Sequence, residues 1–405
     1  MGLISYRPEW RLLANQTDIT ATIRERLISL RYTDEAGIES DMLEIQLADH
    51  DPQHPLRLPP TGAELVLHLG YEGGLKKIGL FVADELELSG PPGVMTIRAR
   101  AAPFDESKAG KSQLQTQKRR KWEAGKKLSD IVRTIAAEHK LQPVIAASME
   151  HITLPQQDQI DESDINFLVR IGKKYDAIIK PAAGRLILAK AGESKSASGQ
   201  KMPAVSLRPG DVSSWRMSLA KREHVGTVMA FWHATKAAKL NEVKAGSGEP
   251  VVRLKRYFPT EAMAMAATRS DLERRARRQA TLSVTLPGRT DVVAEGQLVL
   301  AGFRDGVDGT WTVTRAEHSL DGSGYVTSVE AEWPTETAAA KAGTTAGATP
   351  AATPAGAAPA AKPANTPATH AGSKPGQPAA SGPTPAAPPV TSVPAAPKPT
   401  APPAA

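Results

Sequence analysis

The sequence predicts a mainly β protein of the α+β class, with two small antiparallel β-barrel domains on either side of an α+β domain. Short alternating runs separated by glycine turns fill residues 1–105 and return in residues 201–334. Residues 106–200 change to a helical period. Residues 335–405 are rich in Pro and Ala and contain no aromatic side chain, which predicts a disordered tail.

The first block is predicted to be a barrel because its apolar and polar residues alternate. Leu43, Ile45 and Leu47 share one side of a strand, with Glu44 and Gln46 on the other side. The same alternation recurs in the next apolar run, and glycines punctuate the block. Several short strands with glycine turns favour an antiparallel barrel.

The middle block is predicted to combine two helices with a hairpin. One helical stripe consists of Leu128, Ile131, Val132, Ile135 and Ala136. Asp161 or Ser163 is expected to cap a second helix. The buried stripe of that second helix is expected to consist of Ile165, Leu168 and Val169. Two apolar runs around Gly184 then predict the hairpin.

The last block returns to strands, with one helix inserted near residues 260–280. The predicted strands are Val225–Trp232, Leu282–Leu286, Gln297–Leu300 and a closing hairpin. The apolar side of the helix is expected to consist of Ala262, Met265, Ala266, Leu272, Ala276 and Ala280. Ser270 and Glu273 fit a capping box, which would allow the helix to break and restart there.

The closing hairpin is predicted from turn residues and alternation. Trp311 and Val313 point to one side of its first strand, and residues 319–324 supply the turn. In the return strand, one face consists of Tyr325, Thr327, Val329, Ala331 and Trp333, and the other of Ser328, Glu330 and Glu332. This alternation predicts a half-buried strand.

Composition limits the classes of protein that fit. The chain has no cysteine, so neither disulfides nor cysteine-ligated zinc contribute. No apolar run approaches the roughly 20 residues that cross a bilayer, and residues 1–11 lack the apolar stretch of a signal peptide. We therefore expect no membrane insertion, and synthesis and assembly in a cytoplasm.

The net charge of +7 is unevenly distributed. Residues 107–127 carry eight Lys or Arg against one acid, and a second basic cluster consists of Arg274, Arg275, Arg277 and Arg278. Either cluster could bind phosphates, with Trp122 stacking on a base. We favour a solvated connector for Lys118–Trp122 and a solvated or subunit-facing stripe for the arginines. Nucleic acid is therefore not expected as a partner.

Several groups of residues have side chains that could form catalytic or metal sites. Glu162 and Asp164 could act as acid and base, but helix capping accounts for their position. Metal-ligand chemistry is offered by Asp49, His50, Asp51 and His54, in a loop that prolines interrupt. His318 is expected to form structural hydrogen bonds. We predict no catalytic, cofactor-binding or metal-binding residue, no small-molecule substrate and no enzyme activity, since no catalytic motif occurs.

In their order along the chain, these motifs resemble the late control protein D family of contractile-tailed phages, the tail or baseplate hub proteins. The carboxy-terminal part of the resemblance consists of Gly288-Arg289-x-Asp291, Asp308-Gly309-Thr310-Trp311, His318 and Gly324-Tyr325-x-Thr327. The earlier part consists of Leu58-Pro59-Pro60-x-Gly62, Trp122 with its following helix, and the Glu162-Ser163-Asp164 helix. The last helix also recurs in the hub portion of VgrG spikes. The resemblance covers roughly residues 15–334.

The resemblance implies a structural baseplate hub of a phage, a prophage or a tail-like particle. In that family, two similar barrels per chain and three chains form a ring of six barrels, which adapts a sixfold tail tube to a threefold spike. The implied partners are two further copies in a homotrimer, a trimeric spike protein, the tail tube and other baseplate proteins. Two alternatives stay open: a nucleic-acid-binding late-gene regulator, and a cell-wall-binding or cell-wall-degrading hub.

Overall fold

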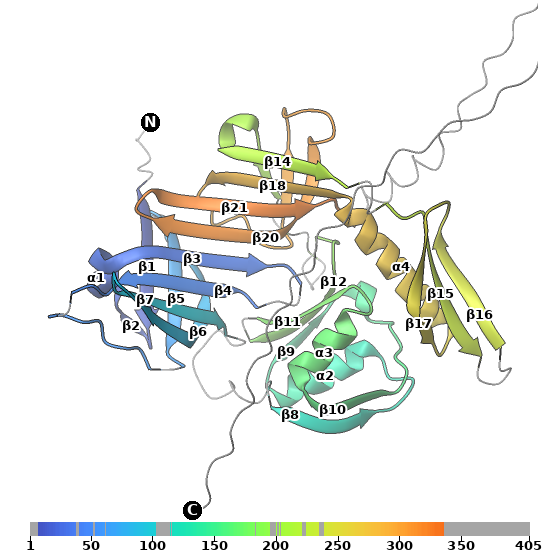
Figure 1. Cartoon of the computed structure of the whole chain (residues 1–405). Coiled ribbons are helices and arrows are strands. Elements are labelled where there is room, and N and C mark those ends of the chain that lie inside the picture. The colour runs from blue at the N-terminus through green and yellow to red at the C-terminus, as the bar shows by residue number, and fades with distance from the viewer. Residues whose placement is uncertain are drawn as a thin grey trace, which may run out of the picture. The chain divides into compact units, whose positions relative to one another are not determined.

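Figure 1 shows the computed structural model of the chain. The residues it describes are 7–37, 40–51, 53–60, 62–102, 114, 116–182, 184–194, 200, 202, 204–220, 224–234 and 239–335. Apart from its first residue, the predicted tail lies outside them. Within the described ranges, no helix is long and apolar enough to cross a membrane.

The described part of the first block consists mainly of strands, as predicted. Its elements are β1 (Pro8–Ala14), β2 (Thr17–Asp18), α1 (Thr20–Ile23), β3 (Leu27–Glu35), β4 (Met42–Ala48), β5 (Glu64–Tyr71), β6 (Lys76–Ser89) and β7 (Val94–Ala101). Leu43, Ile45 and Leu47 are buried on one face of β4, which confirms the alternation.

The middle block contains two helices over two small sheets. Its elements are β8 (Gln117–Trp122), α2 (Leu128–Glu138), β9 (Gln142–Ile145), β10 (Gln157–Ser163), α3 (Asp164–Gly172), β11 (Ala177–Ala182) and β12 (Arg185–Lys190). The strands form a β11-β12-β9 sheet and a β10-β8 pair. The apolar stripe of α2 is buried, which confirms that prediction. In α3 the buried apolar side chains are Phe167, Leu168 and Ile171. Leu168 is therefore confirmed, whereas Ile165 and Val169 are only half-buried, so the stripe is rotated around the helix from its predicted position.

The last block contains β13 (Ala204–Leu207), β14 (Ser214–Leu219), β15 (Thr227–Ala234), β16 (Lys239–Gly246), β17 (Val251–Phe258), α4 (Glu261–Arg278), β18 (Ala280–Pro287), β19 (Gln297–Leu300), β20 (Gly309–Asp321) and β21 (Gly324–Glu332). The strand predicted at 225–232 is present, but it lies in a separate β16-β15-β17 sheet that packs on α4. The helix does not break at Ser270, because Thr260 caps its start and Glu273 instead pairs with Lys190 at 2.6 Å.

The described strands of the first and last blocks join in one 13-stranded sheet. We call β1–β7 the first half, and β13, β14 and β18–β21 the second half. The joint between them is an antiparallel ladder of β20 with β3, in which His318 faces Tyr32 and Leu320 faces Leu30 (Figure 1). No described ladder joins β1 to β3 or β13 to β14, so the hydrogen bonding does not close either half into the predicted barrel.

The two halves repeat one strand order. The first half runs β3-β4-β7-β6-β5-β1, and the second runs β14-β18-β21-β20-β19-β13. Each step is antiparallel in both halves except the last, because β1 is antiparallel to β5 whereas β13 is parallel to β19. The closing hairpin also contributes Leu320 and Tyr325 to the apolar core of the first half. The halves therefore share a core as well as a sheet.

Candidate functional site

The basic run at residues 118–122 is a strand rather than a solvated connector, so that prediction was wrong. It forms β8, whose side chains alternate between two environments. Trp122 is buried and stacks on Phe167 with ring centroids 5.9 Å apart, so it cannot stack on a base. Arg119 points to the other face and pairs with Asp161 at 2.6 Å. The strand forms because the acids that neutralise its cations lie on neighbouring elements.

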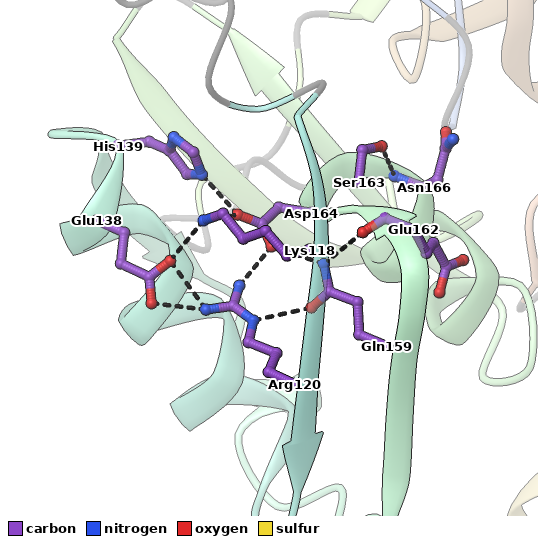
Figure 2. A network of polar contacts seen from close by, with 9 residues as sticks. All are labelled: Lys118, Arg120, Glu138, His139, Gln159, Glu162, Ser163, Asp164 and Asn166. Atoms are coloured by element: carbon purple, nitrogen blue, oxygen red, sulfur yellow. Dashed lines mark hydrogen bonds and ion pairs between the residues drawn. The ribbon is translucent and has the colours of Figure 1, made fainter.

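Asp164, the first residue of α3, is the centre of a charged cluster (Figure 2). Its Oδ2 accepts a hydrogen bond from Lys118 Nζ at 2.7 Å and lies 2.7 Å from His139 Nε2. Its Oδ1 accepts from Gln159 Nε2 at 2.9 Å and from Arg120. The side chain is fully buried, so its negative charge is compensated by these partners instead of by water.

Glu138, at the end of α2, completes the cluster. Lys118 Nζ lies 3.0 Å from it, and Arg120 donates to it at 2.7 Å. Two cations are therefore shared between two carboxylates. The residues come from β8, α2, β10 and α3, so the cluster holds these four elements together. Its two cations balance the charges of its two carboxylates.

The electrostatics of this cluster favour its charged forms. Burial by itself would raise the pKa of Asp164, but Lys118, Gln159, His139 and Arg120 together lower it to about 2. For Glu138, burial is likewise outweighed by Lys118 and Arg120, which lower its pKa. These lowered pKa values are typical of an ion-pair cluster, whereas a general acid would need a raised pKa.

Glu138, His139 and Asp164 also have the composition of a metal site, since their ligand atoms lie within 4.8 Å of one another. However, Lys118 Nζ and the Arg120 guanidinium already bind both carboxylates. A cation placed there would be repelled by two fixed positive charges. The donor set therefore does not fit a metal ion.

The other acids of the motif have separate roles. The hydroxyl of Ser163 accepts from Asn166 N at 3.3 Å and caps α3, as predicted. Glu162 pairs with Arg170 at 2.8 Å. The position of Asp164 was explained by helix capping, and no local pattern marks its partners, which lie up to 46 residues away.

The Asp49–His54 loop does not assemble a metal site in its described part. His54 Nδ1 lies 2.9 Å from Asp51, while Asp49 Oδ1 accepts from Leu56 N at 2.8 Å. His50 is exposed. The carboxylates are thus used in turns and local pairs.

The arginines of α4 do not form a solvated stripe. Arg277 is buried and binds Asp176 at 2.7 Å and Glu332 at 2.8 Å, which corrects its predicted place on the outer face. Arg274 and Arg275 both bind Asp271. Three of the four arginines therefore form ion pairs with acids of the same chain.

His318 joins three strands and is a structural hydrogen-bonding residue, as predicted. Its Nδ1 lies 2.9 Å from the Tyr325 hydroxyl and 3.1 Å from Thr327 Oγ1. Its ring stacks on Tyr32 of β3 with centroids 5.6 Å apart. Burial lowers the pKa of His318 to about 4, so the ring is neutral at physiological pH.

The residues around His318 fix the same joint. At Gly288 a Cβ atom would come within 2.0 Å of the Tyr325 ring, so a side chain there would displace it. The next residue, Arg289, donates its backbone N–H to Thr327 Oγ1 at 2.9 Å. Trp311 donates its indole N–H to Val307 O at 2.8 Å. Gly288 and Arg289 thus hold the β21 residues that contact His318, whereas Trp311 belongs to the core of the second half.

Comparison with known proteins identifies this arrangement. The family described as phage tail baseplate hub (GPD) matches residues 110–324. The probable baseplate hub protein of Escherichia phage P2 is 31% identical over 368 residues, which cover 80% of this chain and 93% of the relative. The chain belongs to the phage tail baseplate hub family. It is a baseplate hub protein of a contractile phage tail.

Solved structures agree on the fold of this hub protein. The 43 kDa tail protein of prophage MuSo2 from Shewanella oneidensis is similar with a TM-score of 0.60 and 12% identity, covering 81% of this chain and 99% of its own. The tail protein from Neisseria meningitidis MC58 gives a TM-score of 0.58 and 12% identity, covering 82% and 99%. The hub family is a structural one, and its motif residues here hold strands and helices together.

Proposed function

We infer that this hub protein acts as a homotrimer, in which three copies bring six sheet halves into one ring. The observation that carries the inference is the repeated strand order of the two halves, because two similar units per chain and three chains give six similar positions. Such a ring has threefold symmetry by sequence and approximate sixfold symmetry by fold. It would adapt a sixfold tail tube to a threefold spike, with each half corresponding to one barrel of the ring.

The proposed mechanism is binding, without bond chemistry. The acids Glu138, Asp164 and Asp176 all bind cations of the same chain. Among the described residues of the basic clusters that suggested a DNA-binding regulator, most arginines pair with acids of the same chain, which leaves them less free to bind phosphates. No feature of the described residues favours a wall-degrading enzyme over a structural hub.

Light scattering on the full-length chain tests this proposal, alone and mixed with the spike and tube proteins of the same phage. A trimer, or a complex with three copies of each protein, supports it. A chain that stays monomeric and binds neither protein contradicts it.

A further inference from the structure

The strands β20 and β6 occupy equivalent places in the two halves, and on one edge of each strand the pairing changes along its length. Residues 309–312 of β20 pair with β19, and residues 315–321 pair with β3. Residues 76–82 of β6 pair with β5. Its residues 84–89 pair with β7 alone among the described strands, so their other edge is unpaired.

A β-bulge lies where β20 exchanges β19 for β3, and another lies where β6 loses β5. The register with β21 shifts between Val313 and Arg315, and the register with β7 shifts between Ala83 and Glu85. These bulges align β6 with β20 residue by residue, so that residue 86 corresponds to 316 and residue 88 to 318. A bulge re-aims a strand and is a designed feature of a sheet.

The partner of β20 also has an equivalent, which is β14. In the first half Leu30 pairs with Ile45, which pairs with Ile97. In the second half Trp215 pairs with Val284, which pairs with Val329. Trp215 therefore corresponds to Leu30. In the described sheet β14 pairs with β18 alone, so it too has an unpaired edge (Figure 1).

The two unpaired edges carry exposed apolar side chains. On β6, Leu86 is 37% exposed and Leu88 56% exposed. On β14, Trp215 is 39% exposed and Leu219 63% exposed. The β20 residues equivalent to the two leucines, Ala316 and His318, are buried against β3. Exposed apolar edge strands are ready to pair with another strand.

We propose that residues 84–89 of β6 bind β14 of a second copy as an antiparallel ladder in the register of the internal β20–β3 joint. Transferring that register places Leu86 opposite Leu219 and Leu88 opposite Met217. Ser89 then lies opposite Arg216. The inference rests on the proposed ring and names its contact between copies.

This register matches the chemistry of both edges. It covers the leucines with apolar side chains on one face of the new ladder. On the other face, exposed Glu87 lies diagonally across from exposed Arg216, within reach of an ion pair. Repeating the same contact around a ring uses up every such edge, which removes the aggregation hazard of unpaired strands.

Disulfide trapping in the full-length chain tests the register, because the native chain has no cysteine. The variant Leu86→Cys/Leu219→Cys should form disulfide-linked dimers and trimers on mild oxidation, since opposed residues lie about 4.5–5.5 Å apart between Cα atoms. The control is Leu86→Cys/Ser218→Cys, in which the second thiol is one residue out of register and faces the other side.

The outcomes separate this inference from the ring itself. Strong cross-linking of the first pair and weak cross-linking of the control support the register. A trimer by light scattering in which the first pair does not cross-link overturns the β6–β14 contact but leaves the ring standing. A monomer under all conditions overturns both.

A second variant does not depend on oxidation. Leu219→Glu places a carboxylate against the apolar side chain of Leu86, so self-association should weaken by about tenfold or more. Leu240, 47% exposed on β16, supplies the matched control Leu240→Glu, which should leave association unchanged. Equal effects of the two substitutions on association would overturn the proposal.

Discussion

The joint between the two halves and the unpaired edges of β6 and β14 are the same structural element in two states. In the joint, His318 of β20 is buried against Tyr32 of β3. At the equivalent place on β6, Leu88 is more than half exposed. The difference indicates that one strand order serves once as an internal contact and once as a surface for another copy. One chain thus contains the β20–β3 ladder and also the unpaired edges of β6 and β14, which are equivalent to its two strands.

The largest expected difference is between the equivalent residues Leu30 and Trp215. Leu30 is fully buried opposite Leu320, so Leu30→Ala should lower the free energy of unfolding by about 2–5 kcal/mol. Trp215 is partly exposed and its ring packs edge-on against Phe303, so Trp215→Ala should cost about 1 kcal/mol. Urea denaturation of both variants, each made in the Leu219→Glu background, would measure the two losses of unfolding free energy. Equal losses would contradict the difference between a paired position and an unpaired one.

His318 makes the joint sensitive to pH. Its pKa is lowered by burial from 6.5 to about 4, so the neutral ring stabilises the fold above about pH 6.5. That stability, about 2–3 kcal/mol, should be lost as the pH falls from 6.5 towards 4. His318→Gln should remove this loss.

Other groups also titrate between pH 6.5 and 4. The contribution of His318 is therefore the difference in stability between the wild-type chain and His318→Gln at each pH. Burial raises the pKa of Glu295 to about 7, which acts in the opposite direction and is common to both proteins. Thermal unfolding at several pH values would measure the difference. A wild-type chain and a variant with parallel pH profiles would rule out a role for His318 in pH sensitivity.

The smallest expected effect concerns the contact of Gly288 with Tyr325. Gly288→Ala would force the ring out of the first-half core, costing roughly 1–3 kcal/mol. Gly322→Ala, in the open turn of the same hairpin, is the matched control and should change stability by less than about 0.5 kcal/mol. Urea denaturation checks both, and a neutral Gly288→Ala would mean that the hairpin is not held at this point.

Local patterns in the sequence predicted the local structure well. The alternation from Tyr325 to Trp333 gave the return strand, and the stripe from Leu128 to Ala136 gave the face of α2. Each pattern is complete within about ten residues, so its physical cause is visible in the sequence. Some of the motif residues that indicated the family, such as Gly288 and Trp311, occupy tightly packed positions.

The remaining features depend on contacts between distant residues. Residues 315–321 read as an ordinary strand, and nothing near them specifies β3 as the partner. Arg277 looked solvated because Asp176 and Glu332, its partners, lie 101 and 55 residues away. Asp164 was interpreted as a helix-terminal acid for the same reason, and so the charged cluster was missed.

Hydrogen exchange tests the central claim most directly, because it reads the backbone edges themselves. In the assembled full-length chain, amides of residues 84–89 and 214–219 should be more protected than in the Leu219→Glu variant, whereas amides of residues 315–321 should be protected equally in both. Amides in 84–89 and 214–219 that exchange equally in the assembled chain and the variant would contradict the claim that these edges pair between copies.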